Sequence, residues 1–169
     1  PFINPLKKLS IVIENNLVIF NNSLGDITAV NIESGALEWQ ISTHNSDDLN
    51  EIISLKTSNL IIDKNKIFFS NNKNVFYSLD LDTGNINWKQ NISSSVKPTV
   101  IGDLLFTISD NGYLFLIDKD RGNIVRINDI FKNFKPKEKK NLVPTGFILD
   151  NNNLYVSTNF GKLLIVNIE

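Results

Sequence analysis

The sequence predicts an all-β protein, a β-propeller of four-stranded antiparallel blades with about four blades present. First, the chain consists of apolar runs of four to six residues rich in Ile, Val, Phe, Tyr and Leu, separated by Asn, Asp and Gly. Such runs indicate strands and hairpins. Second, AVNIESGALEW at residues 29–39 returns as SLDLDTGNINW at residues 78–88. A four-stranded unit that recurs about every 40 residues is typical of a propeller.

Each unit reads strand, tight turn, strand, turn, strand, glycine, strand. The turn before the third strand aligns the four units on Gly25, Asn74, Gly112 and Gly161. We therefore expect a single partial propeller over residues 1–169, with blades at about residues 9–42, 51–92, 96–130 and 142–169. The last of these ends before a fourth strand.

The spacing of the units reveals two insertions. The four turn residues lie 49, 38 and 49 residues apart, and the extra residues fall at about 43–50 and 131–141. Both insertions follow the fourth strand of one unit and precede the first strand of the next. In a propeller such connections emerge on one face, and long loops on a rigid scaffold are where binding is concentrated.

The repeated phrase occupies the turn from the third to the fourth strand. We expect the glycine there to take a positive φ, the Asn or Asp side chain to cap backbone N–H groups, and the Trp to dock on the neighbouring blade with its indole N–H on a backbone partner. The alternative for the Trp is stacking on a ligand. These blade-docking residues are Asn31, Gly35, Trp39, Asp80, Gly84, Trp88, Asp118 and Gly122. In the third unit Arg126 stands where Trp is expected, which puts that contact in question.

Composition removes several classes of function. The chain has no Cys and one His, and its net charge is −1. Disulfides, thiolate metal sites and a Cys nucleophile are thereby excluded, and we expect His44 on the surface without metal or triad partners. The charge gives no reason to expect nucleic-acid binding. No apolar run approaches the length of a membrane-spanning helix. We expect no catalytic residue, cofactor or metal.

The second insertion is basic. It carries five lysines with Phe134 and Glu138 between them, at positions 132, 135, 137, 139 and 140. A solvated loop is the simple interpretation. Contact with an acidic protein patch or with lipid headgroups is the alternative, and it makes Lys135 and Lys137 candidate partner-binding residues.

The units resemble tryptophan-docking repeats of the pyrroloquinoline-quinone type, on Ala29-x-Asn31-x-x-Ser34-Gly35-x-x-x-Trp39 and its counterpart ending in Trp88. Their order and ending are similar to the BamB family, propeller lipoproteins of the outer-membrane β-barrel assembly machine. The stretch from VKPTVIGD through VPTGFILDNNNLYVSTNFGKL is most similar to alphaproteobacterial members. The resemblance implies the C-terminal half of an eight-bladed disc, with Glu169 a true C-terminus and Pro1 not a true N-terminus.

The resemblance also implies a function. BamB-like proteins are noncatalytic scaffolds of the periplasm, associated with the outer membrane of Gram-negative bacteria. They bind the periplasmic domains of the central barrel subunit, and a nascent barrel strand is a further expected partner. Acidic residues contribute to that contact in some members. The matching stretch here has none, so Asp47, Asp48 and Glu51 just upstream are the candidates, together with Lys56 in the stretch itself.

The remaining expectations concern the membrane, the open ends and the alternatives. Membrane attachment is expected only through a lipid anchor outside this chain, and self-association through the open edges of the half-disc. One alternative is a fragment of a quinone-dependent dehydrogenase with its catalytic residues elsewhere. A ligand-sensing or protein-interaction propeller is the other.

Overall fold

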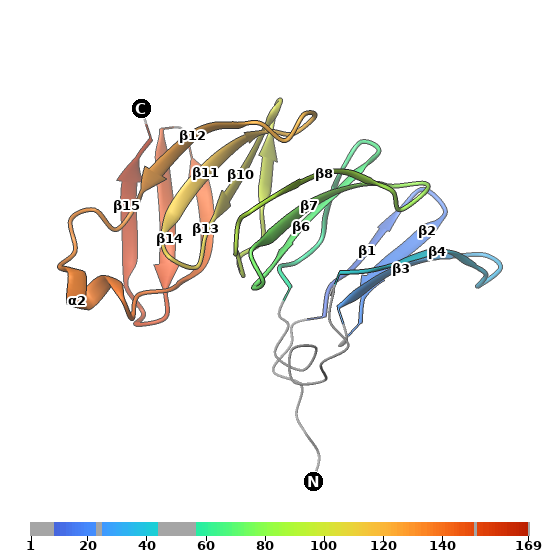
Figure 1. Cartoon of the computed structure of the whole chain (residues 1–169), viewed down its shortest axis with the longest axis horizontal. Helices are drawn as coiled ribbons and strands as arrows, with labels where there is room; N and C mark the ends of the chain where they lie inside the picture. Colours follow the sequence, from blue (N-terminus) through green and yellow to red (C-terminus); the bar gives the residue numbers. More distant parts are fainter. Residues whose placement is uncertain (1–8, 23–24, 44–56, 151, 169) are drawn as a thin grey trace, which may run out of the picture.

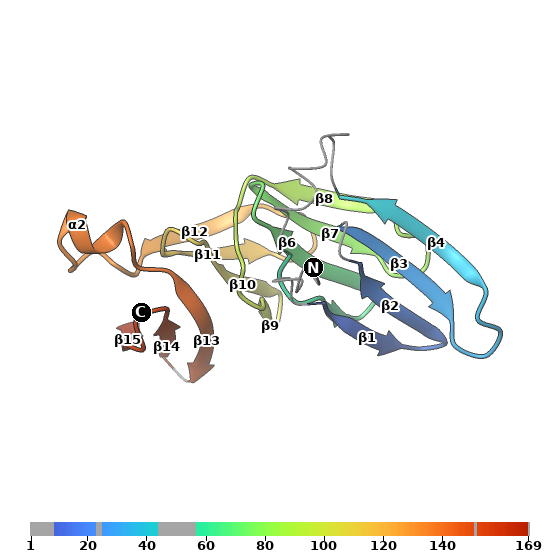
Figure 2. The same ribbon diagram turned by 90° about the horizontal axis from the view of Figure 1, so that it is seen from below.

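The structure, a computed structural model, describes residues 9–22, 25–43, 57–150 and 152–168. Figure 1 and Figure 2 show four antiparallel sheets that lie side by side in sequence order, each formed by strands that follow one another along the chain. The predicted all-β propeller fold is thus confirmed. The sheets are called blades 1 to 4 below.

Blades 1 and 2 each have four strands. Blade 1 consists of β1 (Ile11–Glu14), β2 (Leu17–Asn21), β3 (Asp26–Asn31) and β4 (Leu37–Ser42). Blade 2 consists of β5 (Ile61–Asp63), β6 (Lys66–Asn71), β7 (Val75–Asp80) and β8 (Ile86–Gln90). Neighbouring strands are joined by tight turns, so each pair is an antiparallel hairpin.

Blade 3 repeats this pattern with β9 (Thr99–Ile101), β10 (Leu104–Ile108), β11 (Tyr113–Asp118) and β12 (Ile124–Asp129). Blade 4 has three strands among the described residues: β13 (Pro144–Asp150), β14 (Asn153–Thr158) and β15 (Leu163–Asn167). Between blades 3 and 4 lies the short helix α2 (Pro136–Lys139). Figure 1 shows α2 at the lower end of blade 4.

The core consists of three apolar clusters, one between each pair of consecutive blades. Strand β6 contributes side chains to two of these clusters, because its successive residues point to opposite faces of the sheet. Ile67 and Phe69 pack toward blade 1, whereas Phe68 between them packs toward blade 3. Because successive side chains of a strand point to opposite faces, an inner strand buried on both sides must be apolar at every position. This explains the unbroken apolar run of Ile67, Phe68 and Phe69.

The outer faces of the terminal blades are bare and apolar. On blade 1 the side chains of Ile11 and Ile13 are 67% and 60% exposed, although Val12 between them packs into the core. On blade 4 Ile148 and Ile165 are 65% and 64% exposed. These faces have the composition of the blade interfaces but no sheet covers them within the described part of the chain.

Buried hydroxyl groups connect blades 2 and 3. Ser58 Oγ accepts a hydrogen bond from the backbone N of Ser70 at 2.9 Å, and Ser70 Oγ accepts one from the backbone N of Ser94 at 3.1 Å. The hydroxyls donate in turn, Ser70 to the carbonyl oxygen of Ile92 at 3.0 Å and Ser94 to that of Ile108 at 2.8 Å. Since buried polar groups are stable only when hydrogen-bonded, this chain also sets the relative position of the segments it joins.

Candidate functional site

The turn between the third and fourth strands has the same geometry in blades 1 to 3. In blade 1, Asn31 Oδ1 accepts hydrogen bonds from the backbone N of Glu33 at 3.1 Å and of Ser34 at 3.0 Å. Asp80 and Asp118 accept the corresponding pairs in blades 2 and 3. The glycines that follow, Gly35, Gly84 and Gly122, have φ of 68°, 70° and 77°. A side chain that caps its own turn and a glycine in the left-handed region together close each turn.

The first two blade junctions are each closed by a tryptophan. Trp39 Nε1 donates to the carbonyl oxygen of Leu81 at 3.0 Å, and its ring lies so close to Gly84 that an added Cβ would be 2.6 Å from Cε3. Trp88 Nε1 donates to the carbonyl oxygen of Lys119 at 3.0 Å, and its ring covers Gly122 in the same way. Both indoles therefore dock on the turn of the following blade and are not available as ligand-stacking surfaces.

Arg126 closes the third junction. Its Nη1 donates to the carbonyl oxygen of Ile168 at 3.0 Å, the position that corresponds to Leu81 and Lys119 in the earlier junctions. The absence of a Trp here put this contact in question, but the guanidinium supplies the missing donor. The strand pairing shows a matching change. Ala29 and Ser78 lie opposite the two tryptophans, whereas Leu116 lies opposite Arg126.

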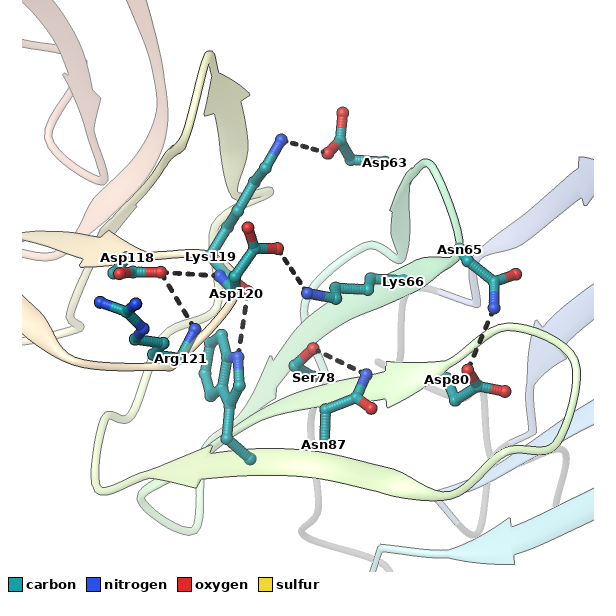
Figure 3. Close-up of polar contacts among 11 residues, drawn as sticks. Asp63, Asn65, Lys66, Ser78, Asp80, Asn87, Asp118, Lys119, Asp120 and Arg121 are labelled. Atoms are coloured by element: carbon teal, nitrogen blue, oxygen red, sulfur yellow. Dashed lines mark hydrogen bonds and ion pairs between the residues drawn. The ribbon is translucent and has the colours of Figure 1, made fainter.

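Two ion pairs join blades 2 and 3 (Figure 3). Lys119 Nζ lies 2.6 Å from Asp63 Oδ2, and its side chain is only 5% exposed. The hydrogen bond that Lys119 donates to Asp63 raises the pKa of Lys119, although burial opposes this. Lys66 pairs with the exposed Asp120, and that contact lowers the pKa of Asp120. These carboxylates and amines neutralise each other between blades and are structural.

The basic segment after blade 3 is anchored to the propeller. This segment, residues 131–141, is called loop 131–141 below. Its first residue, Phe131, is fully buried and lies on Gly112, where an added Cβ would be 2.1 Å from the ring. Lys139 Nζ pairs with Asp129 Oδ2 at 2.7 Å. Pro136 begins α2, and Glu138 Oε2 accepts from the backbone N of Lys135 at 3.3 Å, which closes its first turn.

The predicted partner-binding residues divide into two groups. Lys135 and Lys137 are exposed on loop 131–141. Asp47, Asp48, Glu51 and Lys56 lie outside the described residues, as does His44. Sequence reasoning missed Phe160 and Lys162, which join Phe134 and Lys137 around a recess beside this loop. They lie in the turn between β14 and β15, where only the turn itself was recognised.

No group of three or more His, Cys, Asp or Glu side chains within the described ranges could hold a metal ion. Nor does any helix there have the length and apolar character needed to cross a membrane.

The blades follow one another in sequence order, and an indole or guanidinium donor closes each junction. This arrangement defines a β-propeller of the tryptophan-docking class. A family model described as outer membrane protein assembly factor BamB matches residues 5–128. The chain therefore belongs to the BamB family. The match ends within β12, so blade 4 lies beyond it.

Solved structures show the same fold. BamB from Moraxella catarrhalis is 17% identical with a TM-score of 0.64, over 96% of this chain and 46% of that one. The computationally designed Ika4 protein is 14% identical with a TM-score of 0.68, over 97% of this chain and 93% of that one. The designed Ika8 protein is 14% identical with a TM-score of 0.68, over 94% of this chain and 45% of that one. This chain thus spans about half the length of the Moraxella protein. No curated protein sequence matches it.

Proposed function

We propose that this chain is part of a noncatalytic scaffold in the periplasm, held at the outer membrane of a Gram-negative bacterium. It binds the periplasmic domains of the central subunit of the β-barrel assembly complex. Membership of the BamB family is the observation that carries this proposal. The chain covers about half of the Moraxella BamB, so the role of the whole protein is transferred here as part of the proposal.

The blade junctions support a scaffold role. A scaffold must present its loops in a constant arrangement, because a loop that is ordered only on binding loses affinity to its own conformational entropy. Trp39, Trp88 and Arg126 hold the blades together, and Phe131 and Lys139 hold loop 131–141 against blade 3. Lys135 and Lys137 are thereby presented on a preformed surface.

Strand β15 supports the contact with a nascent barrel strand. It pairs only with β14 among the described strands, so no described strand covers its other edge. Such an edge can accept an extended strand by β-augmentation.

Binding can be tested with the purified periplasmic domains of the central barrel subunit encoded in the same genome. The chain is immobilised and the domains are titrated in biolayer interferometry. We expect saturable binding, and Lys135→Glu should weaken it by about fivefold, as expected for a surface charge that contributes to an interface. Arg121→Glu is the matched control. It makes the same change of charge, but Arg121 lies in the β11–β12 turn, at the other end of blade 3 from loop 131–141.

Two results would overturn the scaffold proposal. One is no saturable binding of these domains at any concentration tested. The other is stoichiometric uptake of pyrroloquinoline quinone in the presence of calcium, seen as cofactor absorbance that co-elutes with the chain, which would favour the dehydrogenase alternative.

A further inference from the structure

A recess of about 300 Å³ lies between loop 131–141 and the β14–β15 turn. Its apolar lining is Phe134, Leu142 and Phe160, and its polar lining includes Lys137, Glu138 and Lys162. The volume is at the lower end of the range for ligand-binding pockets. Phe160 is 62% exposed, an unusual state for a phenylalanine in a tight turn, where polar residues are the norm.

The walls of the recess are held by contacts on both sides. Phe134 packs edge-to-face on the buried Phe131 with ring centroids 5.9 Å apart. Asn159, next to Phe160, donates from Nδ2 to the carbonyl oxygen of Asn141 at 2.8 Å and accepts from the backbone N of Val143 at 2.9 Å. The turn and the loop are thus tied together, and the recess is present before any ligand arrives.

The rim of the recess is cationic. Lys162 is exposed, and its Nζ lies 5.3 Å from the centroid of the Phe134 ring in a cation–π contact. Neither Lys137 nor Lys162 is paired with a carboxylate from the described ranges. Loop 131–141 carries five lysines and one glutamate in a chain whose net charge is −1, so positive charge is concentrated here.

We propose that this recess binds an acidic peptide segment that inserts one bulky apolar side chain. The inserted side chain packs between Phe134 and Phe160 on Leu142, and acidic side chains on either side of it pair with Lys137 and Lys162. A hollow with charges on its rim fits a peptide better than a membrane, because membrane binding needs apolar side chains that protrude together. The proposal rests on the recess alone and holds whatever the larger partner of the scaffold is.

The test uses the whole chain and a fluorescein-labelled peptide with one phenylalanine between two pairs of aspartates, measured by fluorescence anisotropy. Two control peptides replace the phenylalanine by serine or the aspartates by lysines. We expect binding of the first peptide only. Phe160→Ser and Lys162→Glu should each weaken it by about tenfold. Both side chains are exposed, so neither change disturbs the core, and circular dichroism verifies the fold.

Lys132→Glu is the matched control variant. Lys132 is exposed on the same loop but does not line the recess, so its replacement should change binding by less than about twofold. An equal loss in Lys132→Glu and Lys162→Glu would show nonspecific charge attraction and overturn the proposal. So would equal binding of the serine peptide. Binding to phosphatidylglycerol vesicles without binding to the peptide would overturn it in favour of a membrane surface.

Discussion

Arg126 donates from its guanidinium to the backbone carbonyl oxygen of Ile168, across the junction between blades 3 and 4. In the two preceding junctions an indole N–H makes the equivalent bond at the same distance of 3.0 Å. The junction therefore requires a donor on the fourth strand that reaches the carbonyl after the third strand of the next blade. An indole provides this bond and also covers a glycine, whereas the guanidinium of Arg126 provides the bond and also donates from Nε to Asn128 Oδ1 at 2.9 Å.

Arg126→Ala should lower the free energy of unfolding by about 1 kcal/mol, because an exposed hydrogen bond to a charged donor is worth about that much. Urea denaturation followed by tryptophan fluorescence measures the change. Arg121→Ala is the control, since the Arg121 side chain is exposed and makes no contact across the junction. Equal loss in the two variants would show that the bond to Ile168 contributes nothing to stability.

Gly84 and Gly35 provide a matched pair for the docking of Trp39. Their φ angles are 70° and 68°, so an alanine is strained in the left-handed region at either position, at a cost of about 1–2 kcal/mol. Only at Gly84 does the added Cβ overlap a ring, whereas at Gly35 no atom lies within 4 Å. We expect Gly84→Ala to be about 2 kcal/mol more destabilising than Gly35→Ala. Similar denaturation midpoints for Gly84→Ala and Gly35→Ala would argue against tight docking of Trp39 on Gly84.

Asp63→Asn should destabilise the chain, because it leaves the nearly buried ammonium of Lys119 without its counter-charge. Removing one partner of a fully buried ion pair lowers the free energy of unfolding by about 3–5 kcal/mol. Because Asp63 is 29% exposed, we expect a smaller loss of about 2 kcal/mol here. The double variant Asp63→Asn with Lys119→Met should recover part of this loss. A double variant as unstable as the sum of the two single variants would show that the pair is not coupled.

The pH dependence of Asp120 follows from its pairing with Lys66. The contact lowers the pKa of Asp120 below its ordinary value of 3.8, so the pair contributes stability above about pH 4 and loses it as the carboxylate is protonated at lower pH. Carbon-13 NMR of the carboxyl carbon should show that Lys66→Met moves the titration midpoint upward. Lys73→Met, in the β6–β7 turn, should leave it unchanged. A midpoint unaffected by Lys66→Met would contradict the pairing.

The bare outer faces predict self-association of the isolated chain. Ile11 and Ile13 project from the outer face of blade 1. Replacing both with lysine should shift the sedimentation velocity profile toward the monomer, because charge on an apolar face opposes its burial. Val125→Lys, at a position 61% exposed on the outer strand β12 of blade 3, is the control. Association that persists unchanged in the double variant would locate the contact elsewhere.

Much of the fold could be predicted from the sequence, because its signals are local. Strand and turn chemistry repeats at regular spacing. An Asn or Asp and a glycine mark the third-to-fourth turn in blades 1 to 3, and a small residue precedes them in blades 1 and 2. The same repeat predicted which way Trp39 and Trp88 face. Loop 131–141 was visible as an insertion, and its lysines were visible as a charge cluster.

The remainder depends on contacts between residues far apart in sequence. Arg126 could not be assigned its partner, because Ile168 is 42 residues away and an arginine has many possible acceptors. Lys119 reads as a surface lysine until its partner Asp63, 56 residues earlier, is placed beside it. Phe160 belongs to a turn whose sequence does not indicate which segment lies beside it. It becomes part of a recess only when loop 131–141 folds against it.

The class of fold, the blade order and the position of the docking turns could thus be inferred from the sequence, since each of these depends on backbone preferences within a few residues. The closure of the third junction, the charges neutralised between blades and the cationic recess became visible in the folded chain alone. Those features arise when blades pack, and packing joins side chains whose separation along the chain carries no local signal.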